Sequence, residues 1–382
     1  MKRPTIITIG IVCILAVFGI WVYLLLFGTP EESNEVFTNL GFDIANREPA
    51  IVTELPTEPV YTVDTVSSGL NQITTKPVAG YVATTISSSS VVLFAEQGTG
   101  HVYEINLDTG AETLRSRTTV PRTQEAYFSA DGSAVALVSI DGYIRDTYVG
   151  RIATTTQSIN TATLPPNARN ISFATNNAVQ YTWVDNDQLR GYEQNITDNT
   201  VRELFTAPFQ SAMVIWDDTQ NYLYNNPADD LLGYIYPIDG GTYQPSIARG
   251  YGLVATKLGQ YIAYSAQNEI GTVAELLDTE SKEVYQSPVI IIPEKCAYDD
   301  VSNTLFCAAP AGNSLHINDW YAGTITSGDY LWLIQATNQA ASIEVNLSEV
   351  SGRTIDVTNL STTQDNIFFT NKIDNTLWQY NP

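Results

Sequence analysis

From about Leu70 to its end, the chain repeats a pattern of short apolar strands and polar turns, and this repeat restricts the fold more than any other feature. Each unit of about 42 residues holds four apolar segments separated by turns rich in Asp, Asn and Gly. In the clearest unit, residues 126–165, an Asp131-Gly132 hairpin turn joins the first two segments. Four strands at this period are typical of a β-propeller. The sequence therefore predicts an all-β fold.

The units predict a seven-bladed propeller closed by an N-terminal strand. The last unit, residues 354–382, contains only three of the four strands. Residues 70–77 (LNQITTKP) have the character of a fourth strand, and adding them to the last unit would leave no open sheet edge. An insertion at 311–329 interrupts the sixth unit, so six or eight blades remain alternatives.

Residues 6–27 form an apolar run without a charged residue. As a helix, about 22 residues would span about 33 Å, which is close to one bilayer core. Lys2 and Arg3 precede the run and acidic residues follow it, which predicts a cytoplasmic N-terminus. A cleaved signal peptide is the alternative, but its apolar part is about 7–15 residues long and ends in small residues. We predict a transmembrane anchor at 1–28, in contact with the lipid bilayer through residues 6–27, and an extracytoplasmic propeller at the cell membrane.

Residues 29–68 contain four prolines and eight acidic residues against one arginine, which predicts an extended acidic stalk. The predicted propeller domain then covers residues 69–382. The whole chain carries 18 Lys and Arg against 41 Asp and Glu, a formal net charge of −23. Because nucleic-acid backbones are bound through clustered cations, this charge argues against a nucleic-acid partner.

Two of the three cysteines, Cys296 and Cys307, lie in neighbouring apolar segments. A two-residue turn at 301–302 would place them directly opposite each other on paired strands. An oxidising compartment would then allow a cross-strand disulfide, with two free buried thiols as the alternative.

The segment FSADGSAVALVS (128–139) resembles the strand, Asp-Gly turn and strand unit of WD40-like and TolB-type (PD40) propeller repeats. The turns at 108–110 (DTG) and 277–279 (LDT) are similar, although no single unit carries both the Gly-His and the Trp-Asp pair of true WD40 repeats. Residues 293–310 and 355–381 resemble membrane-anchored propeller proteins of candidate-phylum bacteria, a group without an assigned biochemical function. The resemblance implies topology and fold and implies no chemistry.

The sequence lacks the short motifs that mark common catalytic, metal or cofactor sites. It contains no G-x-S-x-G, no C-x-x-C, no H-E-x-x-H and no glycine-rich phosphate loop. Carboxylate pairs such as Asp217-Asp218 fit turn positions better than calcium ligands. We therefore predict no catalytic residue, no metal and no cofactor.

The insertion at 311–329 is the candidate partner-binding site. Exposed aromatic residues beside polar groups often form recognition surfaces. Packing of Trp320 against a neighbouring blade is the alternative. The candidate residues, in the insertion and just after it, are His316, Asp319, Trp320, Tyr321 and Trp332.

These features predict a non-catalytic binding or scaffolding module for an envelope protein or a surface polymer. Tethering would raise its effective concentration at the membrane. The alternative is a glycan-processing hydrolase or lyase that uses carboxylates on the central face of the propeller. A sensory ectodomain is a third possibility, and it would need a membrane partner because the predicted cytoplasmic tail is very short.

Overall fold

The computed structural model describes residues 69–382, except for five two-residue gaps at 154–155, 269–270, 313–314, 337–338 and 364–365. The predicted anchor at 1–28 and the predicted stalk at 29–68 lie outside the described residues. Within 69–382, the structure contains no helix that is long and apolar enough to cross a membrane.

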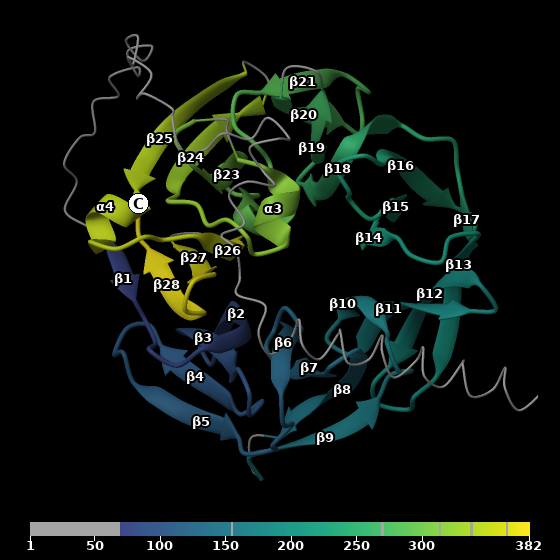
Figure 1. The fold of residues 1–382 in the computed structure, drawn as a ribbon. Coiled ribbons are helices and arrows are strands. Elements are labelled where there is room, and N and C mark those ends of the chain that lie inside the picture. Colours follow the sequence, from purple (N-terminus) through teal and green to yellow (C-terminus); the bar gives the residue numbers. More distant parts are fainter. Residues whose placement is uncertain (1–68, 154–155, 269–270, 313–314, 337–338, 364–365) are drawn as a thin grey trace, which may run out of the picture. The chain divides into compact units, whose positions relative to one another are not determined.

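The described chain is almost entirely β-strand, and its antiparallel sheets follow one another in chain order around a common centre (Figure 1). The first three sheets have four strands each. They are β2 (Val78–Ile86), β3 (Ser89–Glu96), β4 (Val102–Asn106) and β5 (Glu112–Ser116); β6 (Thr123–Phe128), β7 (Ala134–Asp141), β8 (Ile144–Ala153) and β9 (Ser158–Thr163); and β10 (Arg169–Thr175), β11 (Ala178–Asp185), β12 (Gln188–Asn195) and β13 (Val201–Ala207).

A larger sheet follows, in which β16 pairs with β18 and so joins two sets of strands. Its strands are β14 (Met213–Ile215), β15 (Tyr222–Tyr224), β16 (Leu232–Asp239), β17 (Thr242–Tyr243), β18 (Ala248–Leu258), β19 (Tyr261–Asn268), β20 (Gly271–Asp278) and β21 (Val284–Ser287). The next sheet contains β22 (Cys296–Asp299), β23 (Thr304–Ala309), β24 (Tyr330–Gln335) and β25 (Ala340–Asn346).

The last sheet combines both ends of the described chain. Strands β26 (Val357–Thr362), β27 (Ile367–Asn371) and β28 (Thr376–Tyr380) come from the C-terminal end, and β1 (Leu70–Gln72) pairs with β28. Leu70 lies opposite Tyr380 in an antiparallel register. The strand pairing predicted for residues 70–77 is therefore present, over the first three of these residues.

The second strand of a sheet is typically buried on both of its faces. In β7, every residue from Ala134 to Val138 is fully buried, and Val91 to Ala95 in β3 are at most 2% exposed. Alternate side chains of a strand point to opposite faces of its sheet, so both faces must be covered. Face-to-face packing of neighbouring sheets explains why these segments are continuously apolar in the sequence.

The first strands of neighbouring sheets approach each other closely at the centre. A Cβ atom on Gly80 in β2 would lie 1.9 Å from the main-chain oxygen of Ala126 in β6. Only glycine allows this backbone approach, because any other residue would overlap that oxygen.

Cys296 and Cys307 lie directly opposite each other in the β22–β23 register, as predicted. The structure joins them in a disulfide within this sheet. Both residues are buried, so the bond crosses between two strands inside the core.

Candidate functional site

A cavity of about 980 Å³ lies among the first strands of the sheets. Residues of β2, β6, β10, β14 and β26 line it, together with Glu294 from the segment before β22. Its charged side chains are Glu125, Arg145, Arg169 and Glu294. Aromatic and amide side chains complete the wall, among them Tyr81, Tyr127, Phe173, Trp216, Gln124 and Asn359. This mixture of rings, amides and balanced charges suits a polar organic ligand.

Glu125 in β6 is held as an ion. Arg145 donates to both of its carboxylate oxygens, with a distance of 2.6 Å between Nη1 and Oε1. The Tyr127 hydroxyl donates to Oε2 at 2.8 Å. Burial opposes ionisation, but the hydrogen bonds and charge of Arg145 and the bond from Tyr127 outweigh it and lower the pKa of Glu125. This carboxyl is therefore ionised at neutral pH.

Glu294 has the opposite environment. It belongs to the short helix η1 (Pro293–Lys295), and its Oε2 accepts a hydrogen bond of 2.6 Å from the Tyr321 hydroxyl. Burial raises the pKa of Glu294, and this effect exceeds the lowering by the Tyr321 bond and by the charges of Lys372 and Lys295. Glu294 therefore keeps its proton to a higher pH than an ordinary glutamic acid.

The two glutamates approach the cavity from different sides of the ring. Glu125 lies near the start of β6, and Glu294 lies just before β22. In chain order, the β10 sheet and the larger sheet separate them on one side, and the β26 and β2 sheets on the other (Figure 1). One cavity thus contains a carboxyl group whose pKa is lowered and a carboxyl group whose pKa is raised.

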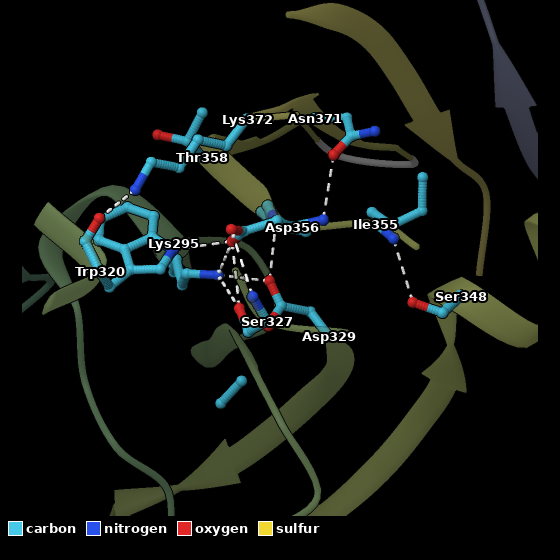
Figure 2. A network of polar contacts seen from close by, with 12 residues as sticks. Lys295, Trp320, Ser327, Asp329, Ser348, Ile355, Asp356, Thr358, Asn371 and Lys372 are labelled. Atoms are coloured by element: carbon cyan, nitrogen blue, oxygen red, sulfur yellow. Dashed lines mark hydrogen bonds and ion pairs between the residues drawn. The ribbon is translucent and has the colours of Figure 1, made fainter. Parts of the chain in front are cut away.

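A buried network holds the segment that carries Glu294 (Figure 2). The Lys295 ammonium group donates to Asp356 Oδ1 at 2.6 Å, to Ser327 Oγ at 2.9 Å and to Asp329 Oδ2. The Trp320 indole donates to the same Asp356 oxygen at 2.8 Å. The side chains of Lys295, Asp329 and Asp356 are all 0% exposed.

This network links four segments of the chain to one another. They are η1, the helix α3 (Ile317–Tyr321), and the segments that lead into β24 and β26. Glu294 precedes Lys295 directly, and Tyr321 follows Trp320 directly. Fixing Lys295 and Trp320 therefore also fixes the backbone positions of the hydrogen-bonded pair Glu294 and Tyr321.

Lys372 lies at the edge of the network, as Figure 2 shows. Its ammonium group donates to the Trp320 main-chain oxygen and lies 3.7 Å from the centroid of the indole ring. Burial lowers the pKa of Lys372, while the charge of Asp356 opposes this shift. Contact with the indole face adds a cation–π attraction.

The structure buries two of the three aromatic candidates in and after the insertion and leaves the third, Tyr321, 39% exposed. Trp320 is only 2% exposed and Trp332 only 7%, because Trp320 packs into the network and Trp332 donates to the Ala309 main-chain oxygen at 3.1 Å. The packing alternative stated for Trp320 is the one observed. His316 and Asp319 are exposed and line neither the central cavity nor the smaller cavity beside Trp183. Their role in partner binding stays a prediction.

Sequence reasoning found the Tyr321 segment but missed Glu125, Glu294, Arg145 and Arg169. All but Arg145 lie in the first strand of a sheet or just before it, where side chains can face the ring centre. Charged residues at the starts of the predicted first strands were the available signal. Arg145 lies at the start of a third strand, and only its pairing with Glu125 brings it into the cavity.

No family model and no curated protein matches the chain. Among solved structures, it is similar to an oligogalacturonate lyase in complex with manganese, with a TM-score of 0.55 and 13% identity over 82% of this chain and 92% of that chain. It is also similar to an oligogalacturonate lyase from Vibrio parahaemolyticus, with a TM-score of 0.53 and 12% identity over 82% and 93%. The β-propeller domain of the Trilobed protease from Pyrococcus furiosus gives a TM-score of 0.52 and 9% identity over 80% and 93%.

These similarities show that the described chain is a β-propeller, and at 9–13% identity they show the fold alone. They also correct the expectation of a non-catalytic scaffold. Two of the three structures are lyases that match this chain over most of their length. The expectation of a non-catalytic scaffold is therefore not kept. In the described ranges, His, Cys, Asp and Glu side chains form no group of three or more that could hold a metal ion.

Proposed function

We propose that the chain is a glycan-processing enzyme whose central cavity binds the sugar chain between Glu294 and Glu125. The observation that carries this proposal is that one cavity contains two carboxyl groups in opposite environments. Glu125 is paired with Arg145, and Glu294 is half-buried and accepts a hydrogen bond from a tyrosine hydroxyl. Groups whose pKa values are pushed apart in one site are suited to divide the roles of acid and base.

Glycoside hydrolysis uses two carboxyl groups on either side of the scissile bond, and this proposal requires Glu125 and Glu294 to lie about 5–10 Å apart around the bound sugar. A protonated carboxyl donates its proton to the leaving oxygen, and an ionised carboxylate activates water or attacks the sugar ring. In this proposal Glu294 is the acid, because its pKa is raised. Glu125 is the carboxylate, and Arg145 and Tyr127 fix its orientation while leaving lone pairs on both oxygens for the reaction.

A lyase is the second candidate. Elimination next to a sugar carboxylate requires a cation that stabilises the negative charge of that group. Arg169 lines the cavity and, within the described ranges, forms no ion pair. The similarity to oligogalacturonate lyases supports this candidate at the level of fold.

We also infer the finer architecture from these sheets. The larger sheet counts as two blades, β14–β17 and β18–β21, which gives seven blades in total. Pairing of β1 with β28 completes the last blade. The extracytoplasmic location and the membrane anchor remain part of the same proposal, since a glycan-cleaving enzyme at the cell surface would meet its substrate there.

Product analysis on a panel of neutral and acidic oligosaccharides tests the function. A hydrolase releases new reducing ends alone, and a lyase also forms an unsaturated sugar that absorbs ultraviolet light. Glu125→Gln and Glu294→Gln should each reduce cleavage at least about 100-fold, since positioned acids and bases contribute about 10²–10⁴-fold. Glu203→Gln is the matched control, because Glu203 is also paired with an arginine but lies outside the cavity. Cleavage that is equal in all three variants would refute the proposal.

A further inference from the structure

The two arginines that line the central cavity differ in their ion pairing. The Arg145 guanidinium is engaged by both oxygens of Glu125. Arg169 lines the same cavity, and among the described residues no carboxylate lies within ion-pair distance of it. Its charge does reach Glu125, whose pKa it helps to lower. In a chain with a net charge of −23, an arginine left without a counter-ion in a cavity is free to bind an anionic group of a ligand.

The start of β10 is built to hold Arg169 in a particular direction. The β10–β11 register shifts between Arg169 and Ser172, and such bulges re-aim side chains. Asn170 between them has a φ of +48°, a left-handed conformation that few residues adopt. Its side chain donates to Thr182 Oγ1 at 2.8 Å and to the Ala212 main-chain oxygen at 3.0 Å. The Asn170 main-chain oxygen also accepts a hydrogen bond from the Trp216 indole. These bonds stabilise the strained backbone beside Arg169.

Arg169 and Asn170 also line a second cavity, of about 270 Å³. It lies over the ends of β11 and β12, and Trp183, Gln210 and Ser211 contribute to its wall. Because the same two residues line both cavities, a ligand that passes Arg169 could occupy the central cavity and the second cavity at once. An indole ring with polar neighbours is a suitable platform for the apolar face of a sugar ring.

We propose that the two cavities form one extended site for an acidic oligosaccharide, in which Arg169 binds a uronic-acid carboxylate and Trp183 packs against the next sugar unit. This inference rests on the central cavity being the glycan site proposed above. It adds the substrate class and the path of the sugar chain from the central cavity into the second cavity. A neutral glycan would leave the Arg169 charge without a counter-ion, whereas a uronic acid would supply one.

Calorimetric titration of the full-length chain with trigalacturonate and with the neutral galactose trisaccharide of the same linkage tests the inference. Wild type should bind the acidic trisaccharide more tightly. Arg169→Gln should weaken that binding about 10- to 100-fold, because a charge-assisted hydrogen bond is lost, and should leave the neutral probe unchanged. Arg169→Lys should retain part of the affinity. Arg117→Gln is the control, since Arg117 is an exposed arginine that lines neither cavity.

Chain length tests the second cavity. Trp183→Leu should weaken binding of the trisaccharide and leave binding of galacturonate itself unchanged. Equal affinity of wild type and Arg169→Gln for trigalacturonate, or no binding of trigalacturonate by wild type, overturns the inference. Binding without cleavage would instead refute the proposed enzyme and leave the binding site standing. Cleavage of a neutral glycan without any binding of trigalacturonate would refute the acidic-oligosaccharide site and leave the proposed enzyme standing.

Discussion

Replacing Lys295 by methionine should destabilise the propeller strongly. The Lys295 ammonium group lies 2.6 Å from Asp356 Oδ1 and 2.9 Å from Ser327 Oγ, and it also pairs with Asp329. The lysine and both aspartates are 0% exposed. Methionine fills a similar volume but leaves two buried carboxyl groups without their cation. Removing one partner of a buried ion pair costs about 3–5 kcal/mol.

That loss is large compared with the whole stability of a folded domain, which is about 5–15 kcal/mol. Urea unfolding followed by tryptophan fluorescence would measure it as a lower midpoint with an unchanged slope. Lys76→Met is the control, because the pair of Lys76 with Glu112 is partly exposed and such pairs contribute about 1 kcal/mol or less. If Lys295→Met and Lys76→Met lose equal stability, the network does not hold the fold together as argued.

Three further predictions concern stability. Replacing Cys296 and Cys307 by alanine should cost about 3 kcal/mol, the chain-entropy value for a short loop, and reductant should then no longer affect the unfolding midpoint. Gly80→Ala should lower the free energy of unfolding by about 1–3 kcal/mol, whereas Gly328→Ala, with no atom closer than 3.4 Å, should have little effect. Since the pKa of Glu294 is raised above 4.5, its proton stabilises the fold most at acidic pH, and this contribution is lost as pH rises through the raised value. Melting temperatures measured against pH should therefore show Glu294→Gln gaining on wild type toward alkaline pH.

Sensitivity of the variant without Cys296 and Cys307 to reductant would mean that the redox effect does not come from this disulfide. Equal stability of the two glycine variants would mean that the strands at the centre separate without cost. A pH-independent difference between wild type and Glu294→Gln would show that the carboxyl ionises normally in the folded protein.

Much of the fold could be predicted from the sequence because repeated local patterns determine it. Polar turns between apolar strands recur in every unit, and doubly buried strands such as β7 appear as continuous apolar runs. The Cys296–Cys307 pairing followed from counting residues across one short turn. Strand β1 was predictable because the last unit lacked one strand.

The site could not be predicted in the same way, because it depends on contacts between distant units. Glu125 and Glu294 are far apart in the sequence and line one cavity only because the sheets are arranged in a ring. The polar residues around Trp320 in the sequence suggested an exposed aromatic side chain. In the structure, Asp356 accepts a hydrogen bond from its indole and the Lys295 ammonium group lies over its ring, and both residues are distant in the sequence. A single charged residue within a β-rich repeat does not show which carboxyl will be ion-paired and which will be shielded.

Activity on substrates that differ only in their leaving group tests the central claim most directly. We expect Glu294→Gln to lose at least about 100-fold in kcat/KM on a natural glycosidic bond, yet to retain most activity on an aryl glycoside whose leaving group needs no proton. Glu125→Gln should lose activity on both substrates, because the ionised carboxylate is needed in each case. Equal losses on both substrates in Glu294→Gln, or full activity in either variant, would contradict the assignment of acid and carboxylate across this cavity.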